Sequence, residues 1–275
     1  MTTMTVSETV RLTKLRLEPI AKEESLQQAK LLVAAVIGAD ASALSVHSWM
    51  EINEEQLRIL GELIERREKG EPLQYILGEW EFMGFPFAVD ERVLIPRQDT
   101  ELLCETALER IRNYAYRNVL DLCTGSGCVA IALQKLAGVQ MTASDVSRDA
   151  LDVAKENAKL NDAEVTFVES DLFNCVEGKF DLITCNPPYL SEQDMAVLQK
   201  EIKFEPAAAL YGGVDGLDFY RRIANEYKPH LEAGGTLLLE IGCTQGENVR
   251  ALFGGNAKIL NDLNGNPRVM IVENI

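Results

Sequence analysis

Beyond residue 117, short apolar segments of strand length alternate with amphipathic helical segments, and this alternation constrains the fold more than any other feature. Strands buried on both faces appear as continuous apolar runs, and the helices that connect parallel strands carry one apolar face. The pattern therefore predicts an α/β domain with a mostly parallel sheet and helices on both faces. The predicted strands are residues 118–122, 141–145, 165–169, 180–186 and 235–241, with helices at 128–137 and 150–160.

The end of the chain departs from this alternation. Residues 257–263 and 268–275 both have the composition of strands, and Asn264-Gly265-Asn266-Pro267 between them is a strong turn sequence. A turn of this kind joins neighbouring antiparallel strands. The last strand is therefore predicted to run antiparallel to the rest of the sheet.

The N-terminal part has a different pattern. Between residues 10 and 70, apolar residues recur at three- and four-residue spacing, and Gly38 and Gly70 are predicted to end helices. From residue 72 to 96, aromatic and β-branched residues punctuated by Gly78 and Gly84 indicate a β-hairpin. We predict a helical domain at residues 1–72, a linking hairpin at 73–95 and the α/β domain at 96–275.

The net charge and the apolar segments limit the partners of the chain. A net charge of −16 disfavours a broad phosphate-binding surface, so the expected partner is a protein, or a nucleic acid bound through a small local patch. No apolar segment has the length of a membrane span. Basic residues interrupt the first twenty positions, which form no secretory signal, although a short organellar presequence stays open. Cytoplasmic localisation is expected, and the six cysteines, with no C-x-x-C pair, indicate no metal site.

A glycine-rich turn directly follows the first predicted strand, with the sequence Asp121-Leu122-Cys123-Thr124-Gly125-Ser126-Gly127. Glycines there let backbone N–H groups approach a ligand at the N-terminus of the next helix. Asp145 ends the second strand, where a carboxylate accepts hydrogen bonds from ribose hydroxyls. These features alone also fit a dinucleotide site. Asp121 favours S-adenosylmethionine instead, because a carboxylate attracts the ammonium of a methionine moiety and repels a pyrophosphate; the alternative is that Asp121 only caps the loop.

A second candidate segment, Ser170-Asp171-Leu172-Phe173, follows the third predicted strand. The Asp171 carboxylate is suited to accept a hydrogen bond from an adenine amino group, and Leu172 and Phe173 to cover the ring. A plain turn at the end of a strand explains the same residues.

The fourth strand is predicted to end at Asn186-Pro187-Pro188-Tyr189, and two consecutive prolines there fix a rigid turn at the edge where such sheets bind ligands. If Asn186 Oδ1 and the Pro187 carbonyl each accept a hydrogen bond from a flat NH₂ group, they aim its nitrogen at a methyl donor. Tyr189 can stack on the target. Positioning of this kind supplies much of the rate with an activated donor. The tetrapeptide therefore predicts methylation of an amide or amino nitrogen.

Together these motifs resemble the release factor glutamine methyltransferase family, and the resemblance extends along the whole chain. The segments of this sequence that carry it, besides the turn and the tetrapeptide, are Gly70-Glu71-Pro72-Leu73-Gln74-Tyr75-Ile76-Leu77-Gly78, Val93-Leu94-Ile95-Pro96-Arg97, Glu205-Pro206, Asp215-Gly216-Leu217 and Gly234-Gly235-Thr236-Leu237-Leu238-Leu239-Glu240-Ile241-Gly242. Methyltransferases that act on DNA adenine share the tetrapeptide but lack the hairpin segments. The resemblance implies a class I S-adenosylmethionine-dependent methyltransferase fold, that is, a Rossmann-like seven-stranded sheet whose last strand is antiparallel.

The resemblance also implies roles for individual residues. Cofactor contacts are expected from Cys123 to Gly127 and at Asp145, Leu172 and Asn186, and the tetrapeptide from Asn186 to Tyr189 is expected to hold the target amide. The family's substrate is the glutamine of a Gly-Gly-Gln loop in peptide-chain release factors, and its helical domain helps to dock that protein. Cys123 departs from the family, which more often has glycine there; a side chain narrows the permitted backbone conformation at this position but leaves the β region open.

Other functions stay open from the sequence alone. An adenine DNA methyltransferase presents the same flat NH₂ group to the same tetrapeptide, but it needs a surface rich in lysine and arginine. A glutamine of a ribosomal protein is a further candidate target. In an NAD-dependent dehydrogenase, Asp121 and the tetrapeptide would have no role. A catalytically silent binding module would bind the cofactor without turnover. The protein is expected to act as a monomer without stable nucleic-acid binding.

Overall fold

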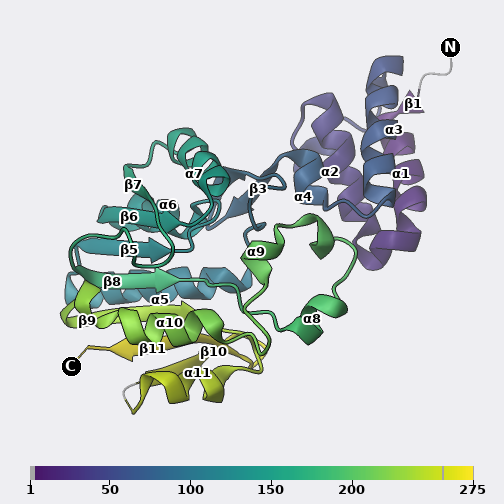
Figure 1. Cartoon of the computed structure of the whole chain (residues 1–275). Helices are drawn as coiled ribbons and strands as arrows, with labels where there is room; N and C mark the ends of the chain where they lie inside the picture. Colours follow the sequence, from purple (N-terminus) through teal and green to yellow (C-terminus); the bar gives the residue numbers. More distant parts are fainter. Residues whose placement is uncertain (1–3, 256, 275) are drawn as a thin grey trace. The chain divides into compact units, whose positions relative to one another are not determined.

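The computed structural model describes residues 4–255 and 257–274, and it divides the chain into two units (Figure 1). The first unit extends to Gly78 and also includes Lys200–Phe204. The second unit comprises Glu79–Gln199 and the chain from Glu205 onward. Within the described residues, no helix has both the length and the apolar character needed to cross a bilayer.

The first unit is helical, as its apolar periodicity predicts. Its core contains Leu32 and Val33 of one helix and Leu60 and Ile64 of another, all at most 3% exposed. Gly38 ends the second helix with φ 69°, a conformation that glycine adopts without steric penalty. The elements are β1 (Met4–Thr5), α1 (Val6–Ala21), α2 (Ser25–Ile37), β2 (Glu51–Ile52), α3 (Glu54–Glu68) and α4 (Leu73–Leu77), with short 3₁₀ turns at Lys22–Glu24, Ala41–Ser45 and Ile202–Phe204.

A buried arginine explains why a distant segment joins the first unit. Arg67 of α3 is 2% exposed, and its guanidinium donates to Gln28 Oε1 at 3.0 Å and to Glu201 Oε1 at 2.6 Å. A buried charge is tolerated only when it is paired and hydrogen-bonded. The sequence pattern gave no indication that Lys200–Phe204 would belong to the helical unit.

The predicted hairpin is shorter than its sequence pattern indicated. Residues 73–77 form helix α4 instead, because Leu73 and Ile76, three residues apart, both enter the core of the helical unit. The hairpin proper consists of β3 (Glu79–Phe82) and β4 (Phe85–Ala88), in which Phe82 pairs with Phe85. Met83 and Gly84 form its turn, with φ values of 53° and 80°, as a tight two-residue hairpin turn requires.

The second unit contains a seven-stranded sheet with the strand order β10-β11-β9-β8-β5-β6-β7. The strands from β9 to β7 are parallel, and β11 pairs antiparallel with both β9 and β10, as the terminal turn predicts. The predicted end of the last strand, Ile275, lies outside the described residues. The strands are β5 (Asn118–Leu122), β6 (Gln140–Asp145), β7 (Val165–Glu169), β8 (Phe180–Cys185), β9 (Leu231–Glu240), β10 (Ala257–Asn261) and β11 (Pro267–Glu273).

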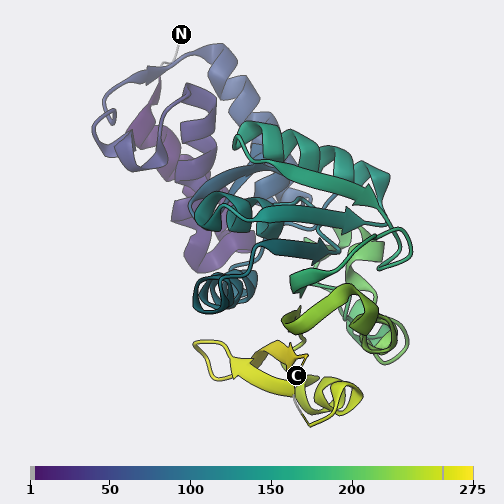
Figure 2. The same ribbon diagram turned by 90° about the vertical axis from the view of Figure 1, so that its left-hand side faces the viewer.

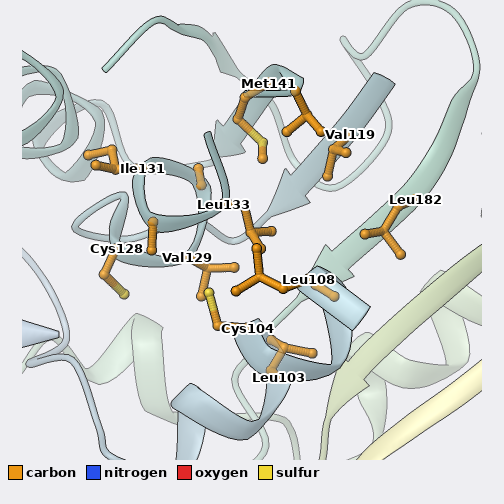
Figure 3. Packing of buried hydrophobic residues seen from close by; sticks show 14 of the residues in the cluster. Leu103, Cys104, Leu108, Val119, Cys128, Val129, Ile131, Leu133, Met141 and Leu182 are labelled. Atoms are coloured by element: carbon orange, nitrogen blue, oxygen red, sulfur yellow. The ribbon is translucent and has the colours of Figure 1, made fainter. Parts of the chain in front are cut away.

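Helices lie on both sides of this sheet (Figures 1 and 2). Alternate residues along a strand face opposite sides, so Val119 packs in one core cluster and Leu120 in the other. Side chains of α5 and α6 face each other in the first cluster, as Leu108 and Leu133 do in Figure 3. The helices are α5 (Asp99–Tyr114), α6 (Cys128–Ala137), α7 (Arg148–Leu160), α8 (Glu192–Ala196), α9 (Ala207–Leu210), α10 (Asp218–Glu226) and α11 (Gly246–Phe253), with a 3₁₀ turn at Lys228–His230.

Candidate active site

A pocket lies where the parallel strands β5, β6, β7 and β8 end, within the second unit. About 1040 Å³ of empty space lies between its walls, including the part that is open to solvent. Parallel α/β sheets bind ligands at this edge. The walls include these residues that the sequence singled out: Asp121, Cys123, Thr124, Gly125, Ser126, Asp145, Asp171, Leu172, Asn186 and Pro188.

Four of the predicted site residues are not among the residues that line this pocket, namely Gly127, Phe173, Pro187 and Tyr189. Gly127 precedes α6 with φ 81°, and a Cβ atom there would meet the side chains of Ile131 and Ala154 at 3.1 Å. A glycine at this position therefore lets α6 pack closely against α7. The roles of Pro187 and Tyr189 stay predictions.

The glycine-rich turn is tighter than expected at Cys123. Its φ is 56°, in the left-handed region and not in the β region that the sequence left open. The turn enforces this conformation, because the next residue, Thr124, donates its N–H to the carbonyl of Ser144 at 3.0 Å. A left-handed residue with a side chain is strained by about 1–2 kcal/mol, and such strain is concentrated at functional sites.

Asp145 connects the turn to the end of β6. Its carboxylate accepts the N–H of Gly125 at 2.9 Å and the N–H of Ser147 at 2.9 Å. Burial, the larger effect, raises the pKa of this carboxyl group, while these hydrogen bonds oppose the rise. A carboxylate has about four lone-pair sites, so Asp145 keeps acceptors for the hydroxyls of a ligand in the pocket.

Asp121 is the most buried acid in this wall of the pocket. It is 2% exposed, and its two oxygens accept the hydroxyls of Thr124 and Thr184, each at 2.7 Å. Burial raises its pKa to about 6, although both hydroxyls lower it. A buried carboxylate with only neutral donors lacks a compensating charge. A ligand ammonium group would supply that charge.

The Asp121→Asn variant is expected to bind S-adenosylmethionine at least about tenfold more weakly, because the ammonium group of the ligand loses its charged partner.

The same variant is expected to change the pH dependence of stability. Because the pKa of Asp121 is raised, the folded protein binds the proton of this carboxyl group more tightly than the unfolded chain does between about pH 4 and 6. The natural protein is therefore destabilised as the pH rises through that range. The variant should be more stable at pH 8, by up to about 3 kcal/mol, and this gain should shrink toward pH 4. Calorimetric titration and urea unfolding measure the two effects; unchanged affinity would exclude the ammonium contact.

The segment after β7 contributes one buried and one exposed residue. Leu172 is 3% exposed and has φ 51°, a second left-handed residue in the pocket wall. The Asp171 carboxylate is exposed and pairs with the guanidinium of Arg222 at 2.9 Å. Leu172 is thus placed to contact a flat apolar group, whereas Asp171 already has a cationic partner.

The tetrapeptide Asn186-Pro187-Pro188-Tyr189 follows β8 at the same edge of the sheet. Asn186 Nδ2 donates to Thr100 Oγ1 at 3.3 Å, and both prolines are buried. Burial raises the pKa of Tyr189 to about 12, so its hydroxyl is neutral. The Tyr189 carbonyl accepts from Gln245 Nε2 at 2.9 Å. The hydrogen bond from Gln245 therefore holds the backbone of this turn in place.

Several residues that build the site were missed by sequence reasoning. Asn157 of α7 is fully buried, and its side chain bonds both backbone groups of Ala88 and the carbonyl of Ser126, at 2.7–3.0 Å. It ties the hairpin to the glycine-rich turn. Its position on an amphipathic helix gave no hint of this role.

An ion pair between Arg97 and Glu205 was also not predicted from the sequence. Glu205 is 6% exposed and pairs with the guanidinium of Arg97, while its other oxygen accepts the N–H of Ile95 at 3.1 Å. Arg97 and Pro206 both line the pocket. The ion pair fixes the segment that contains Arg97 relative to the segment that contains Glu205, because a buried ion pair with additional hydrogen bonds has a defined geometry.

Comparison with solved structures identifies the fold. The structure is similar to a methyltransferase from Pyrococcus furiosus, with a TM-score of 0.52 and 16% identity over 81% of this chain and 99% of that chain. It is also similar to the 16S rRNA N2 G1207 methyltransferase of Thermus thermophilus in complex with AdoMet and guanosine, with a TM-score of 0.53 and 18% identity over 72% of this chain and 50% of that chain. Residues 98–213 match the family model of the methyltransferase small domain. The protein is an S-adenosylmethionine-dependent methyltransferase with the class I fold.

Comparison with sequences narrows the class further. Residues 8–78 match the family model of the PrmC N-terminal domain. The release factor glutamine methyltransferase of Geobacter sulfurreducens is 43% identical over 84% of this chain and 83% of its own length. That of Thermodesulfovibrio yellowstonii is 42% identical over 90% of this chain and 92% of its own length. The chain belongs to the release factor glutamine methyltransferase family.

Proposed function

We propose that this protein transfers a methyl group from S-adenosylmethionine to the side-chain amide nitrogen of the glutamine in the Gly-Gly-Gln motif of peptide-chain release factors. The observation that carries the proposal is the position of Asn186, which lines the same pocket as the buried carboxylate of Asp121 and the half-buried carboxylate of Asp145. The relatives named for this activity support the choice of substrate.

The pocket residues fit S-adenosylmethionine through the chemistry of their side chains. Asp121 would pair with the ammonium group, and Asp145 would accept the ribose hydroxyls. The backbone from Cys123 through Thr124, Gly125 and Ser126 to Gly127 would surround the amino-acid part, with Leu172 against the adenine and Asp171 near its amino group. Two carboxylates in one pocket disfavour a pyrophosphate, and therefore also a dinucleotide. When bound, S-adenosylmethionine supplies a methyl group on a cationic sulfur that leaves as a neutral thioether.

Asn186 and the following residues would prepare the glutamine nitrogen. A carboxamide nitrogen is a weak nucleophile, because its lone pair is delocalised into the carbonyl group. Asn186 Oδ1 and the Pro187 carbonyl each accept one N–H of the target, which turns the nitrogen face toward the methyl group. Pro188 keeps the turn rigid, and Tyr189 stacks on the flat amide. After the new N–C bond forms, the nitrogen carries the positive charge and gives up one proton to solvent, which restores the neutral amide.

The partner would be recognised as a folded protein. We propose that the N-terminal helical unit helps to dock the release factor in the cytoplasm, with the enzyme acting as a monomer. The net charge of −16 disfavours stable nucleic-acid binding. An adenine DNA methyltransferase and a methyltransferase of a ribosomal protein glutamine are the competing functions.

A single change in the substrate tests the chemistry. A release factor whose Gly-Gly-Gln glutamine is replaced by glutamate keeps the shape of the side chain but has no NH₂ group. After incubation with methyl-labelled S-adenosylmethionine, the unaltered release factor should carry label and the glutamate variant should carry none. Equal labelling of both proteins would show that the methyl group goes to another atom.

A further inference from the structure

The β3–β4 hairpin has two outer edges, and its β4 edge is closed by side chains. The carbonyl of Pro86 accepts from Asn161 Nδ2 at 2.8 Å. The N–H and the carbonyl of Ala88 both bond the side chain of Asn157, at 2.7 Å and 3.0 Å. Asn157 lies in α7, and Asn161 directly follows that helix. The outer edge of β4 is therefore covered by α7.

The outer edge of β3 has no such cover. Next to a two-residue turn, the flanking residues of a hairpin exchange hydrogen bonds, and in the next pair the backbone groups point away from the partner strand. Phe82 and Phe85 flank the turn, so Glu81, opposite Pro86, directs its N–H and its carbonyl outward. The outward bonds of Pro86 and Ala88 on β4 follow the same alternation. Within residues 4–255 and 257–274, neither outward group of Glu81 forms a hydrogen bond.

A second cavity borders the β3 side of the hairpin. It contains about 600 Å³ of empty space, including the part that is open to solvent. Its walls come from residues 80–82 of β3, from residues 96–98 and from Glu101 of α5. No residue of β4, all of which the structure describes, is among them. Glu81 is exposed here, and so is Glu79, which the same alternation places on the free edge.

This cavity shares a wall with the active-site pocket. Pro96 and Arg97 line both of them. The guanidinium of Arg97 is held by the buried carboxylate of Glu205, so the shared wall has a fixed position. A polypeptide that places one side chain in the active-site pocket therefore meets the outer edge of β3 where it passes Arg97.

We propose that the segment of the release factor next to the target glutamine binds in an extended conformation to the outer edge of β3, as an added strand. The inference rests on the proposed function, which supplies the substrate. The N–H and the carbonyl of Glu81 would bond the backbone of this segment, and those of Glu79 would extend the pairing. Backbone pairing suits a Gly-Gly-Gln loop, because its two glycines have no side chain that a pocket can recognise.

The charge of this edge favours a different protein over a second copy of the chain. Glu79 and Glu81 are both exposed on it. Pairing of two copies along β3 would bring these acids together, and like charges on neighbouring strands are destabilising. The net charge of −16 adds to this repulsion. A neutral or basic segment of the substrate meets no such penalty.

The Glu81→Pro variant tests the pairing at the level of the backbone. Proline has no N–H, and it is tolerated on an edge strand where the N–H faces away from the partner strand, as it does at Pro86 on the opposite strand. KM for the release factor should rise about tenfold, with a smaller change in kcat, because the added strand loses a donor and leaves an acceptor unpaired. Glu81→Ala keeps the N–H, so its KM should be at least about fivefold lower than that of Glu81→Pro.

Amide hydrogen exchange tests the same pairing in the natural protein. Exchange rates of single amides would be measured with and without a saturating release factor, in the absence of S-adenosylmethionine so that no methyl group is transferred. Exchange at Glu79 and Glu81 should slow at least about tenfold when the release factor binds. The amides of Trp80 and Phe82 already face β4 and should change less.

The outcomes separate this inference from the proposed function. If the natural protein does not methylate the release factor, the proposed function fails, while amide exchange still reports whether the release factor binds β3. If methylation occurs but exchange at Glu79 and Glu81 is unchanged by the release factor, the added strand is wrong. Equal KM values for Glu81→Pro and Glu81→Ala would also exclude it, because the contact would then belong to the side chain. If urea unfolding shows that Glu81→Pro is not folded, the exchange rates of the natural protein decide.

Discussion

The Asn186→Ala variant is expected to transfer methyl groups about 100-fold to 1000-fold more slowly than the natural protein, the loss typical of removing one positioned hydrogen-bonding group from an active site. The variant loses the Oδ1 acceptor that holds the target NH₂ group. It should unfold at nearly the same urea concentration, since the half-buried bond to Thr100 contributes only about 1 kcal/mol. Single-turnover rates at saturating S-adenosylmethionine measure the effect on the chemical step.

A matched control makes this result specific. Asn264→Ala removes the same side chain from the exposed turn between β10 and β11, outside the pocket residues. Its rate should equal that of the natural protein. A rate for Asn186→Ala within about threefold of the natural rate would exclude Asn186 as the residue that holds the target.

The Gly212→Ala variant should lose both stability and activity. A Cβ atom at this position would lie 2.6 Å from the Pro188 carbonyl oxygen and 2.7 Å from Tyr189 Cα. Both atoms belong to a backbone turn that two prolines hold rigid, so neither can move away. We expect a loss of about 1–3 kcal/mol in the free energy of unfolding. Displacement of the tetrapeptide should reduce kcat by at least about tenfold.

The matched control here is Gly255→Ala, because a Cβ atom there meets no heavy atom within 4 Å. This variant should keep both the natural stability and the natural kcat. Urea unfolding and initial rates on the same preparations separate the two effects. A Gly212→Ala protein with natural stability and natural kcat would show that the turn is not held by close packing at Gly212.

Periodicity predicted the sheet because it is a local property of the sequence. The bounds of β5, α6 and β7 agree with the prediction at both ends, and the antiparallel last strand followed from Asn264-Gly265-Asn266-Pro267. Because the parallel strands all run in the same direction, the loops that follow them lie at one edge of the sheet. The pocket at that edge, with Asp121, Asp145 and Asn186 in its walls, was predictable for the same reason.

Features that depend on contacts between distant segments were not predictable. Residues 73–77 have the composition of a strand, yet they form a helix because Leu73 and Ile76 complete the core of the first unit. The left-handed backbone of Cys123 depends on its place between β5 and β6. The bond between Asn186 and Thr100 joins residues 86 positions apart. A periodic pattern identifies the buried face of an element but not the side chains that meet there.

The most direct test of the proposed function is tandem mass spectrometry after incubation with methyl-labelled S-adenosylmethionine, applied in parallel to a purified release factor and to an adenine-containing DNA duplex. Labelling of the Gly-Gly-Gln glutamine, with none on the DNA and none in reactions with Asn186→Ala, is the predicted result. Label on adenine, or on neither substrate, would contradict it.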